Sequence, residues 1–263
     1  MAVESIGGFS ETASTKGHSD GTTSAASGAG LLFASDRGSK QVVVIDLKQK
    51  KIVSKSALAA GPDYVRWVEP TKELWVTEPK DKAIEWFKLD GTTLKKGGSL
   101  TVAGGPESLV IDATRGRAYT HTWKDESVAI DLKTHKEVAR WKNGCAESRG
   151  IALDEAAGWL FIGCDEGAAA VIDVGHEGKQ VAKLAAPKGV DIIAYDPSHK
   201  HLFVPGGDEA KLSVMQVGGS GALRELDRVP TAADASCVTC DGQGHFYVCD
   251  PKAGQLLVFV DRY

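Results

Sequence analysis

The feature that most constrains this chain is an internal repeat. A short strand-like segment with a central aromatic residue occurs six times in the 263 residues. The central aromatics, spaced 42 to 44 residues apart, are Phe33, Trp75, Tyr119, Phe161, Phe203 and Tyr247. A period of this length indicates an architecture in which each repeat buries its apolar face against its neighbours.

Each repeat contains four short strand segments. The aromatic segment, for example Trp159–Cys164, precedes a second apolar segment, Ala169–Val174, and then a more polar third one. A fourth segment, for example Ile192–Pro197, follows a turn rich in Gly or Ala. Four short strands in about 40 residues, with turns between them, are typical of a β-propeller blade.

The chain is therefore predicted to be all-β, a single six-bladed β-propeller over residues 1–263 with four-stranded antiparallel blades. The predicted blades are 18–60, 61–104, 105–144, 145–187, 188–232 and 233–263, the last together with 1–8. The last copy ends at Tyr263 before a fourth strand. The alternating segment 2–6 is predicted to supply that strand, so that the N-terminal strand closes the last blade and removes an exposed edge.

The first blade is the least defined part of this prediction. Its inner strand should lie within residues 20–27, but that segment consists of small and polar residues. The conformation of residues 7–29 is therefore left open.

Composition excludes several classes of function. The formal net charge is −4 with a sequence pI of about 6.0, so no global field attracts nucleic acid or an anionic membrane. No segment approaches the roughly 18 apolar residues of a membrane span, and residues 1–5 lack the basic and apolar regions of a signal peptide. We expect a soluble monomer whose partner is a small molecule or a protein rather than nucleic acid.

The five cysteines are an odd number, so at least one lacks an intramolecular disulfide partner. Cys237 and Cys240 form a CxxC sequence within a predicted strand, where residues three apart point to opposite faces. They are therefore not expected to share a metal ion or a disulfide.

The repeat resembles the YVTN/YncE-like β-propeller family. The pattern is best kept in Trp159–Asp173, in Ile192–Pro197 and in Leu202–Val204, and the resemblance covers nearly the whole chain. It implies a binding protein, periplasmic or secreted in most members, some of which bind DNA or act in metal homeostasis. It is specific for fold and uninformative about activity, because propellers carry many unrelated functions.

A candidate site follows from the predicted topology. The inner strand of each blade begins on one face of the ring, and the following strand ends on that same face, so residues at both places should surround one mouth of the central channel. The candidates for this mouth are His18, Asp20, Asp63, Glu107, His121, Glu147, Arg149, Cys164, Asp191 and Asp234. Cys164 is expected to be the thiol that reacts most readily there.

A ring of carboxylates repels itself unless a cation, Arg149 or protonation relieves the charge. A divalent cation such as Ca²⁺ is one expectation, with Glu107, Glu147, Asp191 and Asp234 as ligands, since hard cations prefer oxygen donors. His121, His18 and Cys164 would favour a softer metal. The alternative is structural: an acidic residue after Gly-Pro, as at Asp63 and Glu107, also accepts hydrogen bonds from turn amides.

Three functions remain open. The first is a binding or scaffold propeller with a ligand or metal site at the acidic mouth. The second is a metal-assisted hydrolase of esters, lactones or phosphoesters, in which the metal polarises the substrate and a carboxylate acts as base or nucleophile. The third is a protein-interaction module without a small-molecule site. Whether the chain is an enzyme is not decided by its sequence, which contains no serine-hydrolase or phosphate-binding motif.

Overall fold

The computed structural model describes residues 21–263 and is built almost entirely of short antiparallel strands. The strands form six small sheets in chain order, five with four strands and one with three. This succession of sheets is the all-β, six-bladed β-propeller that the repeat predicts. By contact density the chain divides into two compact units, and each is described separately.

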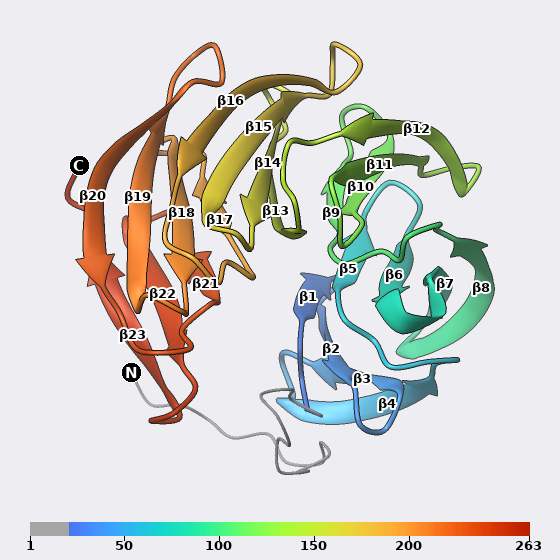
Figure 1. Ribbon diagram of the computed structural model, residues 1–263. Coiled ribbons are helices and arrows are strands. Elements are labelled where there is room, and N and C mark those ends of the chain that lie inside the picture. Colours follow the sequence, from blue (N-terminus) through green and yellow to red (C-terminus); the bar gives the residue numbers. More distant parts are fainter. Residues whose placement is uncertain (1–20) are drawn as a thin grey trace. The chain divides into compact units, whose positions relative to one another are not determined.

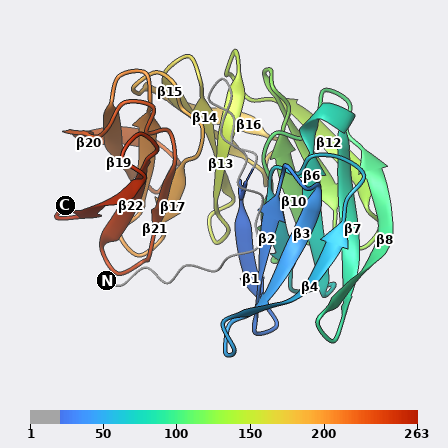
Figure 2. The ribbon, with the colours of Figure 1, turned by 90° about the horizontal axis from the view of Figure 1, so that it is seen from below.

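Unit 1 comprises the described residues up to Ala118 together with Ile130–Glu137. Its first sheet contains β1 (Ala25–Gly28), β2 (Leu31–Asp36), β3 (Gln41–Asp46) and β4 (Lys51–Ala57), which Figure 2 shows side by side. Its second sheet contains β5 (Val65–Val68), β6 (Glu73–Glu78), β7 (Ala83–Asp90) and β8 (Thr93–Thr101), with the 3₁₀ turn η1 (Pro79–Asp81) after β6. The boundary between the units passes through the third sheet, which contains β9 (Val110–Asp112), β10 (Arg117–His121), β11 (Glu126–Asp131) and β12 (Lys136–Lys142).

Unit 2 comprises Tyr119–Ala129 and Val138–Tyr263. Its first complete sheet contains β13 (Ser148–Asp154), β14 (Trp159–Cys164), β15 (Ala168–Asp173) and β16 (Lys179–Ala185). Beside it (Figure 1) lies the sheet of β17 (Ala194–Asp196), β18 (His201–Gly206), β19 (Lys211–Val217) and β20 (Leu223–Pro230). The last sheet contains β21 (Val238–Cys240), β22 (His245–Asp250) and β23 (Gln255–Val260).

The three-strand count of the last sheet agrees with the prediction for residues 233–263. The predicted fourth strand, residues 2–6, lies outside the described residues, so closure by the N-terminal strand stays a prediction. The first inner strand lies at Ala25–Gly28 rather than within residues 20–27. Gly28 ends this strand and approaches the indole of Trp67, where a Cβ atom would come within 2.2 Å of the ring.

The predicted aromatic residues form the cores between neighbouring sheets within each unit. Phe33 and Trp75 in unit 1, and Phe161 and Phe203 in unit 2, are at most 1% exposed. Phe161 packs on Tyr195 of the next sheet with ring centroids 4.8 Å apart, and Phe203 stacks on Phe246 at 4.5 Å. Such rings contribute large buried areas and fix how adjacent sheets pack.

The sixth aromatic residue departs from this pattern. Phe246 takes the core position in the last sheet, while Tyr247, next in the strand, points to the opposite face and is half-buried. That face also carries Leu256 and Val258, which are 62% and 60% exposed.

Candidate functional site

The candidate residues fall into both units. His18 and Asp20 lie outside the described residues. Asp63 and Glu107 belong to unit 1, and the other six candidates belong to unit 2. Of the four residues predicted to bind a metal, Glu107 lies in unit 1, and Glu147, Asp191 and Asp234 lie in unit 2. That all four converge on one site therefore stays a prediction.

Asp63 in unit 1 is held by an arginine that the sequence analysis did not single out. The Nη2 atom of Arg37 donates to Oδ1 of Asp63 at 2.6 Å, and its Nε donates to the carbonyl oxygen of Pro62 at 3.0 Å. Arg37 follows directly after β2. The position of Arg37 directly after a predicted strand is the sequence signal that could have identified it.

Glu78, the last residue of β6, is a buried carboxyl group with an altered proton affinity. Burial raises the pKa of Glu78 to about 7, although the amide of Ala60 donates to Oε1 at 3.1 Å, and the nearby Glu85 carboxylate adds to the rise. Glu85 is itself buried and forms an ion pair with Lys96. Glu78 can therefore exchange a proton near neutral pH. Glu107, just before β9, is also buried.

His121 in unit 2 has the environment of a structural residue. Its side chain is fully buried at the end of β10, and its Nδ1 lies 2.8 Å from Oγ of Ser127. Asn143 donates to the hydroxyl oxygens of Ser127 and Ser148 at 3.1 and 3.0 Å, which extends this polar network. Burial lowers the pKa of His121 to about 3, so the ring is neutral at physiological pH.

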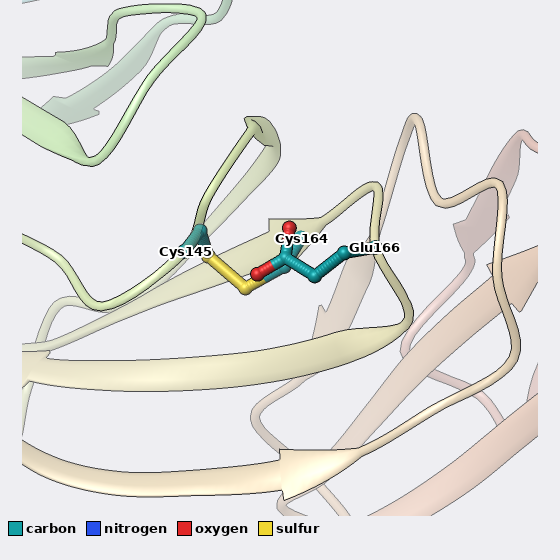
Figure 3. A group of neighbouring side chains, drawn as sticks. All are labelled: Cys145, Cys164 and Glu166. Carbon is teal, nitrogen blue, oxygen red and sulfur yellow. A yellow bond between two sulfur atoms is a disulfide. The ribbon is translucent and has the colours of Figure 1, made fainter.

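The expectation that Cys164 is a reactive thiol is wrong. Cys164 forms a disulfide with Cys145, and both residues are buried (Figure 3). The carboxylate of Glu166 lies beside this disulfide, with ligand atoms of all three residues within 4.8 Å of one another. The two sulfur atoms are bonded to each other and therefore do not act as thiolate ligands for a metal.

Arg149 and the carboxylates of Glu147 and Asp208 lie near the carboxyl group of Asp165 in unit 2. We call Trp123, Glu147, Arg149, Asp165 and Asp208 the Asp165 patch. Arg149 lies 3.5 Å from Oε2 of Glu147 and stacks over the ring of Trp123, with its Cζ atom 5.4 Å from the ring centroid. The amide of Asp165 donates to the carbonyl oxygen of Glu147 at 2.9 Å, which fixes the two loops against each other.

Backbone conformation also positions Asp208 in this patch. Gly189 has a φ of +78° and donates its amide to the carbonyl oxygen of Asp165 at 3.0 Å. A Cβ atom at Gly189 would lie 2.8 Å from Cγ of Asp208, so a larger residue would displace this carboxylate.

The charges of the patch act on the half-buried Asp165. Burial raises the pKa of this carboxyl, Arg149 works against the rise, and the carboxylates of Glu147, Asp208 and Glu166 add to it. Glu166 is satisfied by other groups, because it accepts hydrogen bonds from the amides of Ala146 and Glu147. The patch thus carries an excess of negative charge around a partly desolvated acid.

Asp191 and Asp234 have other surroundings. Asp191 is exposed, and its charge adds to the rise in the pKa of the Cys237 thiol that hydrogen bonding to Cys249 and burial cause. Asp234 is exposed, has a φ of +64° and lies 3.2 Å from Nζ of Lys252. Cys237 and Cys240 are both free thiols, which confirms that they do not share a disulfide.

Comparison with known proteins gives the fold class. No sequence model of a known protein family matches the chain, and no curated protein sequence matches it significantly. Among solved structures, hydrazine synthase of Kuenenia stuttgartiensis is similar with a TM-score of 0.76 and 14% identity, over 91% of this chain and 83% of that one. The Swd1 β-propeller domain from Myceliophteria thermophila has a TM-score of 0.75 and 12% identity, over 94% and 86%.

A third similar structure is a proposed 6-phosphogluconolactonase from Bacteroides fragilis. Its TM-score is 0.70 and its identity 14%, over 86% of this chain and 72% of that one. The likeness is one of fold. It supports the β-propeller and leaves membership of the YVTN/YncE-like family as a prediction. Residues 21–263 contain no helix with the length and apolar character needed to cross a membrane.

Proposed function

We propose that the chain is a binding or scaffold propeller whose ligand site is the Asp165 patch of unit 2, and that the ligand is a small organic cation. The observation that carries the proposal is the half-buried Asp165, whose pKa is raised by burial and by neighbouring carboxylates. A bound positive charge would relieve this repulsion, and shifted carboxyl groups of this kind concentrate at functional sites.

The surroundings of Asp165 favour an organic cation over a metal ion. Glu147 is already paired with Arg149 at 3.5 Å, so a divalent ion would bind beside a fixed positive charge. The ring of Trp123 is 44% exposed and supplies an apolar and π-electron surface next to the carboxylates. Carboxylates next to an exposed aromatic ring suit an alkylammonium group.

Titration calorimetry of the full chain tests this proposal, with tetramethylammonium, a primary diamine and Ca²⁺ as probes. Asp165→Asn should weaken binding of the organic cation at least tenfold, and Arg149→Gln should strengthen it. Glu177→Gln, which removes an exposed charge elsewhere in unit 2, is the matched control and should change nothing. Equal affinities in all four proteins, or binding of Ca²⁺ alone, would contradict the organic-cation site.

A second candidate is the metal-assisted hydrolase of esters, lactones or phosphoesters. One observation favours it: Glu78 has a pKa of about 7, the range in which a carboxyl can act as a general acid or base at neutral pH. The fold likeness to the proposed lactonase is compatible with it. A substrate panel assayed with and without chelator separates the two functions. Turnover that is lost both with chelator and in Glu78→Gln would favour the hydrolase.

We also propose that the two units form one propeller domain of the YVTN/YncE-like type that acts as a monomer outside the cytoplasm. The repeat pattern supports a single domain of this type. The Cys145–Cys164 disulfide is consistent with an oxidising compartment outside the cytoplasm. Sedimentation of the purified chain and localisation of the full-length gene product test the two parts separately.

A further inference from the structure

Cys237, the residue before β21, and Cys249 of β22 are free cysteines that face each other in the last sheet. In the β21–β22 ladder Val238 pairs with Val248, so Cys237 and Cys249 are the next pair. The amide of Cys249 donates to the carbonyl oxygen of Cys237 at 3.2 Å, which continues the pairing to this position. Directly paired residues of antiparallel strands have Cα atoms about 4.5–5.5 Å apart, within the range that a disulfide requires.

Both thiols lie on the same face of this sheet, opposite the face that carries Phe246. Cys249 pairs across β22 and β23 with Leu256, which is 62% exposed, and both cysteines are only partly buried. Tyr247 and Val258 lie on the same face of the sheet as the two thiols.

The two thiols share their protons unequally. They lie within hydrogen-bonding reach, and donation by the Cys237 thiol lowers the pKa of Cys249 to about 7. Backbone hydrogen bonds at Cys237 and Cys249 lower it as well, whereas burial and the charge of Asp191 act in the opposite direction. Hydrogen bonding to Cys249 and burial raise the pKa of Cys237. Near neutral pH a substantial fraction of Cys249 is therefore thiolate, while Cys237 keeps its proton.

The remaining cysteines lack these properties. Cys240 is in the same strand, but burial raises its pKa to about 11 and its Sγ lies 3.5 Å from the carbonyl oxygen of Tyr195. Cys145 and Cys164 are already joined and buried. The chain thus has one buried disulfide, one thiol with a raised pKa and one pair of facing, partly buried thiols.

We propose that Cys237 and Cys249 form a reversible dithiol–disulfide pair that is oxidised by low-molecular-weight disulfides. The Cys249 thiolate attacks one sulfur of the disulfide RSSR, forms a Cys249–SR mixed disulfide and releases RS⁻. Cys237 loses its proton to that RS⁻ and attacks the Cys249 sulfur, which breaks the mixed disulfide and releases the second RS⁻. The two protein thiols are oxidised to one disulfide, and RSSR is reduced to RSH and RS⁻.

Oxidised glutathione is the probe. The native full chain is treated with it at pH 7, the exchange is stopped with acid, and the remaining free thiols are then alkylated. In the wild type we expect a Cys237–Cys249 disulfide that dithiothreitol reverses. Cleavage before Asp241 separates Cys249 from Cys237 and Cys240, so mass spectrometry can assign the bond. In Cys240→Ser the bond should form at an unchanged rate.

Single variants distinguish the first step, attack of Cys249 on glutathione disulfide, from the second, attack of Cys237 on the mixed disulfide. Cys237→Ser should accumulate one glutathione on Cys249, whereas Cys249→Ser should be modified at least tenfold more slowly than the wild type. Alkylation of the unmodified wild type by iodoacetamide, which needs no variant to fold, should occur first at Cys249. The proposal is overturned if Cys240 reacts first, if the bond joins Cys237 to Cys240, or if glutathione leaves Cys249 unmodified.

Discussion

Replacement of Phe161 by Ala is the most informative perturbation of the fold. Phe161 is fully buried at the centre of a cluster that includes Val171, Leu202 and Val204, and its ring lies 4.8 Å from that of Tyr195. A Phe→Ala change at such a site costs about 3–5 kcal/mol, because the ring's transfer free energy is lost and a cavity remains. This is a large part of the roughly 5–15 kcal/mol that stabilises a domain.

Urea denaturation followed by tryptophan fluorescence measures this loss. The midpoint should fall at an unchanged slope, because the surface exposed on unfolding stays the same, and the melting temperature should fall by about 6–20 °C. Val258→Ala is the matched control, since Val258 is 60% exposed and should change stability by less than about 0.5 kcal/mol. If Phe161→Ala lowers the free energy of unfolding by less than about 1 kcal/mol, the packing of the β13–β16 sheet against the β17–β20 sheet is refuted.

Three further predictions concern the disulfide, His121 and the N-terminus. Cys145→Ser with Cys164→Ser should lower the free energy of unfolding by about 3 kcal/mol, since the bond closes a loop of 19 residues; equal stability in oxidised and reduced wild type would contradict this. Because the pKa of His121 falls from 6.5 to about 3 on folding, the stability that its neutral ring contributes is present above pH 6.5 and is lost as the pH drops toward 3. His121→Gln should therefore make the free energy of unfolding depend less on pH between 6.5 and 3. An unchanged pH dependence in this variant would contradict a buried neutral ring. Deletion of residues 1–8 should lower the melting temperature sharply by exposing the edge of the last sheet, and an unaltered melting curve would refute closure by the N-terminal strand.

The sequence predicted the sheets well because the aromatic period and the turn signals are repeated six times. Phe161 and Phe203 are buried as the register requires. The prediction was less accurate where the residues are small and polar, and the first inner strand accordingly lies at Ala25–Gly28. Tyr247 also could not be anticipated, because Phe246 beside it satisfies the same pattern on the opposite face of the strand.

The candidate site was harder to predict because its properties arise from contacts between blades. Cysteine spacing does not reveal connectivity, so the sequence could not show that Cys164 bonds to Cys145 rather than remaining free. The environment of Asp165 depends on Glu147 and Asp208, which come from different repeats. Glu147 was among the predicted site residues, but the burial of Asp165 and its neighbours follow only from the structure.

The measurement that tests the proposed site most directly is a carbon-13 NMR titration of the Asp165 carboxyl group. We predict a pKa above the ordinary value of 3.8 in the wild type, because burial and the surrounding carboxylates disfavour the charged form. Arg149→Gln should raise the pKa further, and a saturating organic cation should lower it. A carboxyl that titrates at its ordinary value and responds neither to the substitution nor to the cation would contradict the account.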